Sequence, residues 1–155
     1  MTKPNVKPIP DGQRTFSYLS VRDAAQAIDF YKRAFGATEV MRLHEPGGKI
    51  GHAEISIDGV VVMLSDEYPD YDAVGPQTVG HTTVSILIYV EDVDAIAERA
   101  VKAGATLLRP IKTEFYGERV ATLKDPFGHK WSFQTRVEDL TPEEMQRRYV
   151  ELVKG

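Results

Sequence analysis

Apolar positions along the chain follow two spacings, and the same order of spacings occurs twice. Between Asp23 and Gly36, and again between Asp92 and Gly104, apolar side chains recur every three or four residues, as in a helix packed on one face. The segments before and after each helix have the alternation and the β-branched content that are typical of strands. Each half therefore predicts a strand, a helix and three further strands, in that order.

Two local signals repeat at a nearly constant offset, which indicates an internal duplication. Val-x-Asp ends at Asp23 and at Asp92, 69 residues apart, and Gly-Ala-Thr begins at Gly36 and at Gly104, 68 residues apart. The aspartate can cap the first turn of a helix, and the glycine can end it in the left-handed conformation. We therefore predict an α+β fold: two tandem βαβββ modules that form a cup-shaped mixed β-sheet, followed by a C-terminal helix.

Turn-forming sequences set the boundaries of the two halves. Asp58-Gly59 predicts a hairpin after segment 50–57, and Asp125-Pro126-Phe127-Gly128 predicts a turn after segment 120–123. Residues 68–80 have the composition of a loop. The predicted organisation is a single domain over residues 1–155, with a first half at about 14–67, a linker at 68–80, a second half at about 81–136 and a C-terminal helix at 141–153.

The predicted C-terminal helix begins at Thr141-Pro142-Glu143-Glu144, which combines an N-cap, a proline in the first turn and a capping-box glutamate. Met145, Tyr149 and Leu152 then form an apolar stripe. We expect this stripe to pack on the sheet or on a partner subunit.

Composition narrows the classes of partner and chemistry. The net charge is −4 and no long run of Lys or Arg occurs, which argues against nucleic acid or an anionic membrane as the main partner. The chain has no cysteine, so disulfides, thiolate nucleophiles and Cys-ligated metals are excluded. Residues 1–14 are polar and proline-rich, and no segment approaches the roughly 18 to 20 apolar residues of a membrane span. We therefore expect a cytoplasmic protein.

Three segments resemble the vicinal oxygen chelate superfamily, the group of glyoxalases, bleomycin-resistance proteins and extradiol dioxygenases. They are Tyr18-Leu19-Ser20-Val21-Arg22-Asp23, Ile28-Asp29-Phe30-Tyr31-Lys32-Arg33-Ala34-Phe35-Gly36 and Asp125-Pro126-Phe127-Gly128-His129-Lys130-Trp131. His52-Ala53-Glu54 and the tail at 137–144 look closest to the branch labelled PhnB-like. The resemblance covers about residues 14–136. It implies a cup built within one chain or shared between two subunits, and it favours a homodimer.

Metal-dependent members of that superfamily hold a divalent ion with His, Gln or Glu side chains on the first and last strand of each half. The matching positions in this sequence are Phe16, Met63, Ser85 and Ser132. Phenylalanine has no donor atom, a methionine thioether suits soft Cu(I), and a serine hydroxyl is a poor ligand for hard ions. We therefore expect no standard metal site and no cofactor.

Strand alternation predicts which side chains share the inner surface of the cup with these four positions. Val62, Leu64, Trp131 and Phe133 are predicted to join the packed layer beneath it. The cup combines aromatic and apolar walls with a few polar groups, which suits a flat organic ligand. For Phe16 and Leu87 the alternative is a core role, and for Arg119 it is a surface ion pair. The predicted ligand-binding residues are Phe16, Tyr18, His52, Glu54, Met63, Ser65, Ser85, Leu87, Tyr89, Arg119, Ser132 and Gln134.

His52 and Glu54 are the candidate catalytic residues, because they alternate onto the same face of one strand. They could act as acid and base, hold part of a relocated metal, or form a hydrogen-bonded surface pair without a chemical role. Three functions follow. The first is metal-free binding of a small planar molecule, as in the bleomycin-resistance members. The second is a lyase, isomerase or dioxygenase that uses a relocated metal or the His52–Glu54 pair. The third is an interaction module that uses helix 145–152.

Overall fold

In a computed structural model, which describes residues 6–155, the first half folds in the predicted βαβββ order, and the second half has the same order with one additional two-residue strand, β7. The part of the predicted domain at 1–5 lies outside the described residues. The first half contains β1 (Tyr18–Val21), α1 (Ala24–Phe35), β2 (Thr38–His44), β3 (Ile50–Ile57) and β4 (Val60–Asp66). The second half contains β5 (Ser85–Tyr89), α3 (Val93–Ala103), β6 (Thr106–Leu107), β7 (Lys112–Thr113), β8 (Glu118–Lys124) and β9 (Lys130–Arg136).

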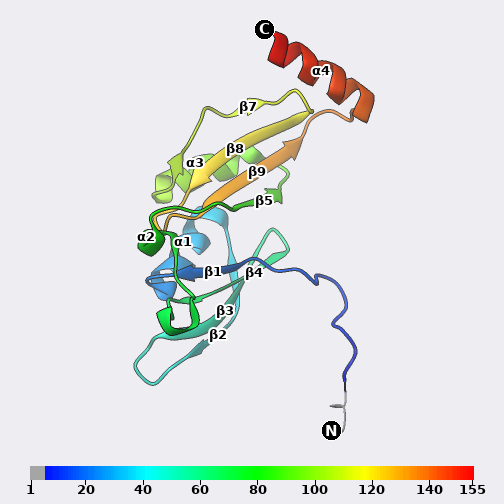
Figure 1. Ribbon diagram of the computed structural model, residues 1–155. Helices are drawn as coiled ribbons and strands as arrows, with labels where there is room; N and C mark the ends of the chain where they lie inside the picture. The colour runs from blue at the N-terminus through cyan, green and yellow to red at the C-terminus, as the bar shows by residue number, and fades with distance from the viewer. Residues whose placement is uncertain (1–5) are drawn as a thin grey trace.

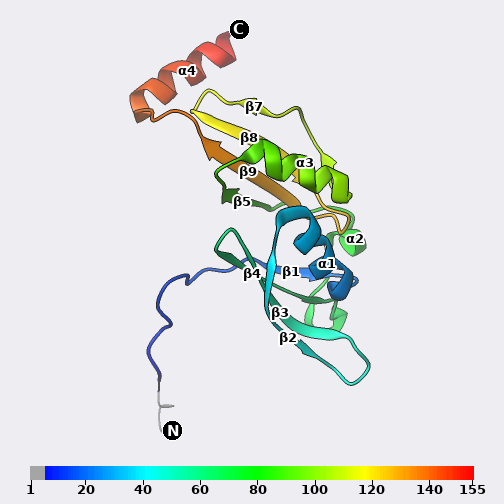
Figure 2. The same cartoon turned by 180° about the vertical axis from the view of Figure 1, so that it is seen from behind.

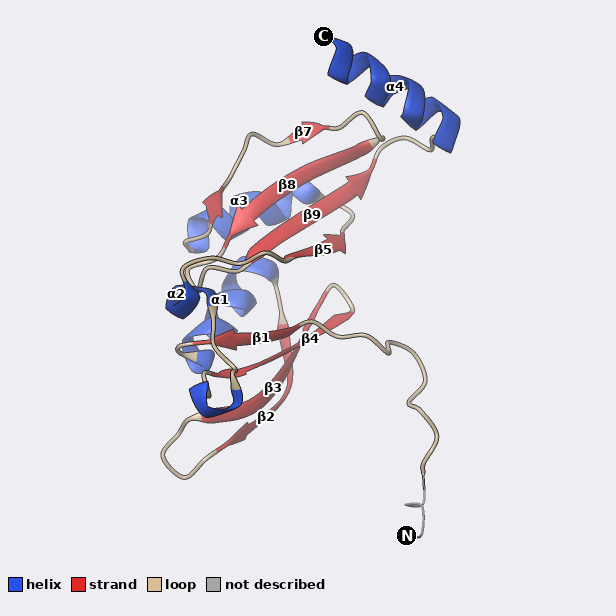
Figure 3. Ribbon diagram, viewed as in Figure 1, coloured by secondary structure: helices blue, strands red, loops and turns tan. Residues whose placement is uncertain are grey.

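The strands form two mixed sheets, one from each of the two predicted modules. The first sheet has the order β1-β4-β3-β2, and the second has the order β5-β9-β8-β6, with β7 also paired to β8. In each sheet the first strand of the half runs parallel to the last one, and the other pairs are antiparallel. β1 and β5 lie at the edges that face each other (Figures 1 and 3).

The helix boundaries follow the predicted capping residues. The carboxylates of Asp23 and Asp92 accept hydrogen bonds of 3.0 Å from the backbone N–H groups of Gln26 and Ala95. Gly36 and Gly104 end the two helices with φ angles of 66° and 119°, in the left-handed region that favours glycine. The same devices thus terminate both copies of the helix.

The two helices lie on the same side of the two sheets and pack against each other (Figure 2). A single cluster of buried apolar residues runs through both halves. Trp131 and Phe133 are fully buried in it, and their rings pack against Phe35 of α1 with centroids 4.9 Å away. Val62 and Leu64 are also buried, so the predicted packed layer beneath the cup is present.

Two irregular regions differ from the predicted strands and loop. The strand expected from 106 to 109 is only two residues long, because Pro110 follows and has no N–H for a ladder hydrogen bond. The predicted linker contains a 3₁₀ turn at Pro69–Tyr71 and a short helix α2 at Pro76–Val79, each begun by a proline. Among residues 6–155, no helix is long and apolar enough to cross a bilayer.

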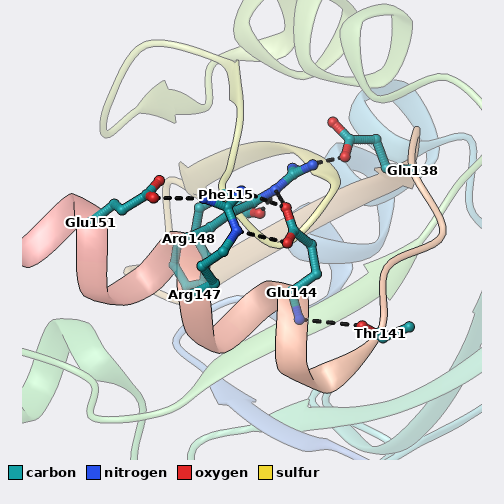
Figure 4. Close-up of polar contacts among 7 residues, drawn as sticks. All are labelled: Phe115, Glu138, Thr141, Glu144, Arg147, Arg148 and Glu151. Atoms are coloured by element: carbon teal, nitrogen blue, oxygen red, sulfur yellow. Dashed lines mark hydrogen bonds and ion pairs between the residues drawn. The ribbon is translucent and has the colours of Figure 1, made fainter.

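The last helix, α4 (Pro142–Lys154), projects beyond the ends of β8 and β9 (Figure 1). The Thr141 hydroxyl caps it by accepting from the Glu144 N–H at 3.2 Å. Arg148 ties it to the body through the Phe115 carbonyl and Glu138, and Arg147 bridges Glu144 and Glu151 on its surface (Figure 4). No residue of α4 is buried, so its apolar stripe does not pack on the sheet in the way that one of our alternatives required.

A partly buried carboxylate gives the stability of the first half a specific pH dependence. Glu39 on β2 accepts hydrogen bonds from Arg42 and Lys32, both at 2.7 Å, which lowers its pKa from 4.5 to about 2. Because the pKa is lower in the folded state, the stabilisation is complete above pH 4.5 and is lost as the pH falls towards 2. We expect Glu39→Gln to reduce the free energy of unfolding by about 1 to 2 kcal/mol at pH 7, a value reduced by partial solvent exposure.

Urea denaturation of wild type and Glu39→Gln at pH 7, 4 and 3 measures this effect. The difference between the two proteins should shrink as the pH is lowered. Glu98→Gln, which removes an exposed ion pair with Lys102 on α3, is the matched control and should change stability little at any of these pH values. An equal loss in the two variants, or a Glu39→Gln effect independent of pH, would contradict the prediction.

Candidate functional site

The uncovered face of the first sheet, opposite α1, brings together side chains from all four strands. Tyr18 on β1 is in register with Met63 on β4, Met63 with Glu54 on β3, and Glu54 with Met41 on β2. Neighbours in register point to the same side of a sheet, so these four side chains form one row. His52 and Leu43 are likewise paired, and they belong to the adjacent row. Sequence reasoning missed Met41 and Leu43, because it assigned no face to this strand, which has register shifts along its length.

A chain of three polar side chains crosses this face. The Tyr18 hydroxyl lies 2.9 Å from His52 Nδ1, and His52 Nε2 lies 3.1 Å from Glu54 Oε1. A carboxylate only accepts, so His52 Nε2–H donates to Glu54, and Nδ1 of the neutral ring accepts from the Tyr18 hydroxyl. About three quarters of the His52 and Glu54 side chains is buried, whereas Tyr18 remains half-exposed. The tyrosine is thus the solvent-facing end of an ordered hydrogen-bonded chain.

The uncovered face of the second sheet repeats the arrangement with different residues. Leu87 and Tyr89 on β5 are in register with Ser132 and Gln134 on β9, and all four share one face. The Tyr89 hydroxyl donates to Glu118 Oε1 at 3.4 Å. Glu118 is buried, and its second carboxylate oxygen has no hydrogen-bond partner among residues 6–155. Alternation along β8 would have revealed Glu118, which lies two residues before Val120 on the same face.

Neither uncovered face is closed by the rest of the chain. Figure 1 looks at the strands with both helices behind them, and Figure 2 shows the helices in front, so the two faces look to the same side. Large side chains on these faces remain accessible, with exposed fractions of 52% for Tyr18, 48% for Leu87 and 53% for Tyr89. We name this surface the open face, defined by Tyr18, Met41, Leu43, His52, Glu54, Met63, Ser65, Leu87, Tyr89, Ser132 and Gln134; Phe16 precedes β1 and is partly exposed. The rest of the chain does not close the open face into a cup.

The sequence matches a family model described as the Glyoxalase/Bleomycin resistance protein/Dioxygenase superfamily over residues 14–133. This chain belongs to that superfamily. The resemblance found in the sequence is therefore confirmed at the level of the family and the fold.

Several known proteins and solved structures are similar to this chain. An uncharacterised protein of Mycobacterium bovis is 42% identical over 132 residues, covering 83% of this chain and 87% of that protein. The crystal structure of TioX from Micromonospora sp. ML1 superimposes with a TM-score of 0.64 at 28% identity, over 83% of this chain and all of TioX. FosX of Listeria monocytogenes, a fosfomycin resistance protein solved with Mn(II) and sulfate, superimposes with a TM-score of 0.62 over 91% of this chain and 99% of FosX. The sequence identity is 19%, so this similarity shows the shared fold alone.

The positions at which metal-dependent members of the superfamily carry ligands do not fit a divalent ion in this member. Met63 lies beside Tyr18, and Ser132 lies beside Leu87, both on the open face. With Phe16 and Ser85 they offer one thioether and two neutral hydroxyls, a donor set unsuited to hard divalent ions. Within residues 6–155, no three His, Asp or Glu side chains gather in an arrangement that could hold a metal. We assign no step to a metal.

The structure separates Arg119 from the other predicted site residues of this superfamily member. Its neighbours along β8, Glu118 and Val120, share a face with Tyr89, so Arg119 points to the opposite, helix-covered side. There its guanidinium donates to both carboxylate oxygens of Asp94 on α3, at 2.6 and 2.7 Å. Arg119 therefore lies away from the open face, and the alternative of a surface ion pair describes it.

Proposed function

We propose that this protein binds a small planar organic molecule against the open face, without a metal, and that a second copy of the chain completes the cup. The observation that carries the proposal is that Tyr18, Leu87 and Tyr89, large apolar and aromatic side chains of the kind that usually pack in a protein core, are exposed on the open face. Aromatic and apolar side chains supply burial for a flat ligand, and the polar groups between them supply orientation.

The polar groups that would orient a ligand lie next to the aromatic ones. Ser65, Ser132 and Gln134 occupy the central strands of the two sheets, where they are buried among larger neighbours. Each apolar wall therefore has a hydrogen-bonding group beside it. An apolar surface with a few fixed polar groups is typical of small-molecule binding sites. The relatives are uncharacterised proteins, so their names indicate no ligand. We therefore infer the class of ligand from the side chains of the open face.

A twofold homodimer is the assembly that we propose, located in the cytoplasm. A homodimer is the commonest closed assembly, and it would place the open face of one copy against that of the other. Sedimentation velocity should give a dimer for the wild type. Leu87→Asp, which puts a charge in the middle of the open face, should shift the protein towards a monomer.

Calorimetric titration with planar aromatic compounds tests the binding. The probe series is 8-anilinonaphthalene-1-sulfonate, 5-nitrobenzotriazole and a quinoxaline. At least one should bind with a Kd below about 1 mM, and Tyr89→Ala should weaken that binding at least tenfold through the loss of an aromatic wall.

Val101→Ala provides the matched control for this titration. Val101 is half-exposed on α3, on the side of the molecule away from the open face. Truncating it should leave the affinity unchanged. Equal weakening in the two variants, or no probe bound below about 1 mM, would remove the proposal.

An enzymatic function is the second candidate, and the contact of His52 with Glu54 at 3.1 Å is the observation that favours it. In this alternative the protein is a lyase or an isomerase that uses the pair as acid and base. Among residues 6–155, no third His, Asp or Glu side chain joins the pair in an arrangement that could hold a metal. This favours the acid–base form over a relocated metal, on which the dioxygenase alternative depends.

A further inference from the structure

We propose that Tyr18, His52 and Glu54 form a proton relay in which the Tyr18 hydroxyl takes a proton from a planar carbon acid bound on the open face. The proposal rests on the proposed function, because the substrate has to lie on that face. Its chemistry is general-base catalysis of elimination or isomerisation, and it needs no metal, cofactor or redox partner.

The order of the three groups is fixed by the strands that carry them. His52 and Glu54 are two residues apart on β3 and point to the same side, while Tyr18 comes from β1, across the intervening strand β4. The distances of 2.9 Å and 3.1 Å lie in the hydrogen-bonding range for both links. A hydroxyl hydrogen-bonded to an imidazole whose other nitrogen faces a carboxylate is the arrangement that activates the hydroxyl in catalytic triads.

The proton balance follows from the tautomer that Glu54 imposes. His52 Nδ1 is free to take the Tyr18 hydroxyl proton, while the Tyr18 oxygen takes a proton from the substrate carbon. His52 becomes an imidazolium, and Glu54 stabilises that charge at Nε2. The electron pair of the broken C–H bond forms the new double bond of the product, with departure of a leaving group in an elimination. Return of the proton from Nδ1 through Tyr18 to product or water restores the relay.

The surroundings suit a base that works through Tyr18. Met63 lies in register between Tyr18 and Glu54, and Met41 lies in register on the far side of Glu54, so a ligand that reaches the exposed Tyr18 hydroxyl would also meet apolar side chains. A further titratable group whose pKa is influenced by Tyr18 is Tyr68, which contacts Glu45 and Lys49. The Tyr68 hydroxyl donates to Glu45 at 2.8 Å, which raises the pKa of Tyr68 to about 12, and Lys49 lies over the Tyr68 ring. Tyr68 therefore stays protonated and does not compete as a base near neutral pH.

The test uses 5-nitrobenzisoxazole, a planar carbon acid whose reaction needs only a base. Removal of its C3 proton breaks the N–O bond and releases a coloured cyanonitrophenolate, so turnover is followed by absorbance. The full-length protein should accelerate the reaction well beyond an equal concentration of free imidazole. Tyr18→Phe and His52→Gln should each lower kcat about 100-fold or more with little change in KM, as expected for loss of a general base.

The pH profile and the control variants separate a relay from a structural role. The wild-type rate should rise with pH through one deprotonation, and His52→Gln should abolish that dependence. Glu54→Gln should lower kcat and shift the imidazole ¹⁵N resonances of His52 away from the Nε2–H tautomer. His44→Gln, which removes an exposed histidine of β2, is the matched control and should leave kcat unchanged. A Tyr18→Phe rate equal to that of the wild type would overturn the relay, since His52 would then act alone.

Binding and turnover are measured separately, so that the two proposals can fail independently. Titration with 5-nitrobenzotriazole, an unreactive compound of the same shape, reports binding alone. Binding without any turnover above free imidazole would overturn the relay and support the proposed function. Absence of both binding and turnover would overturn both proposals.

Discussion

Replacing Asp125 with alanine is expected to lower the free energy of unfolding by about 4 to 6 kcal/mol, a large part of the roughly 5 to 15 kcal/mol of an ordinary domain. The buried carboxylate accepts hydrogen bonds from the Tyr31 hydroxyl at 2.6 Å and from Trp131 Nε1 at 2.9 Å. It also accepts from the backbone N–H groups of Phe127 and His129 in its own turn, both at 2.9 Å. Alanine would leave two buried side-chain donors without a partner and would open the turn.

Urea denaturation followed by far-ultraviolet circular dichroism measures the loss. Tyr31→Phe removes only one of the four bonds and should cost about 1 to 2 kcal/mol, which keeps the prediction testable if Asp125→Ala does not fold. Asp58→Asn is the matched control. Asp58 lies in the hairpin turn of the first half, is exposed and has a φ of 48°, a conformation that asparagine tolerates. A cost for Asp125→Ala similar to that of Asp58→Asn would contradict the prediction.

The Asp125 contacts also show how the two halves become one packed unit. Tyr31 belongs to α1 in the first half, and Trp131 belongs to β9 in the second. Burial and the neighbouring carboxylate raise the pKa of Tyr31, so its hydroxyl remains a donor throughout the neutral range. One carboxylate therefore holds a helix of one half against the last strand of the other. Sequence analysis found this aspartate as a turn residue, but a contact across 94 positions carries no local signal.

Local patterns predicted the elements and the faces, because both depend on periodicity and capping. Asp23, Gly36, Asp92 and Gly104 define helix ends through groups within a few residues of each other, and the structure confirms each one. Alternation also placed Trp131 and Phe133 in the buried layer. Features that depend on contacts across the fold were not predicted. The Tyr18–His52 hydrogen bond joins residues 34 positions apart, and the choice of Asp94 as the partner of Arg119 depends on how α3 lies over β8.

The sequence did not predict how the sheets of the two modules lie relative to each other. A duplicated βαβββ pattern specifies the order of strands within each half, but it does not specify whether the edges of β1 and β5 form hydrogen bonds with each other. In the structure they do not, and the linker between the halves occupies part of the space at their ends. The arrangement of the two parts of the open face therefore also depends on where this linker lies.

After Asp125→Ala, the largest expected loss of stability comes from adding a single carbon at Gly75 in this linker. A Cβ there would meet the backbone carbonyl oxygen of Ser20 on β1 well inside van der Waals contact, and that oxygen cannot swing away as a side chain would. The Gly75 N–H also donates to Glu67 at 2.7 Å, which fixes the backbone from the other side. We expect Gly75→Ala to cost about 2 to 3 kcal/mol through overpacking, although its φ of −94° suits alanine.

Gly47→Ala is the matched control, since a Cβ at Gly47 meets no atom within 4 Å. It should be neutral or slightly stabilising, because alanine restricts the unfolded chain. The same urea denaturation compares the two variants, and equal stability would show that the linker yields to the added carbon.

The linker also contacts both halves: Arg22 of the first half donates to the Gln77 carbonyl at 3.0 Å, and Gln77 donates to the Pro126 carbonyl at 3.3 Å. A linker displaced by Gly75→Ala should therefore shift one half against the other and weaken ligand binding on the open face, whereas Gly47→Ala should leave binding intact.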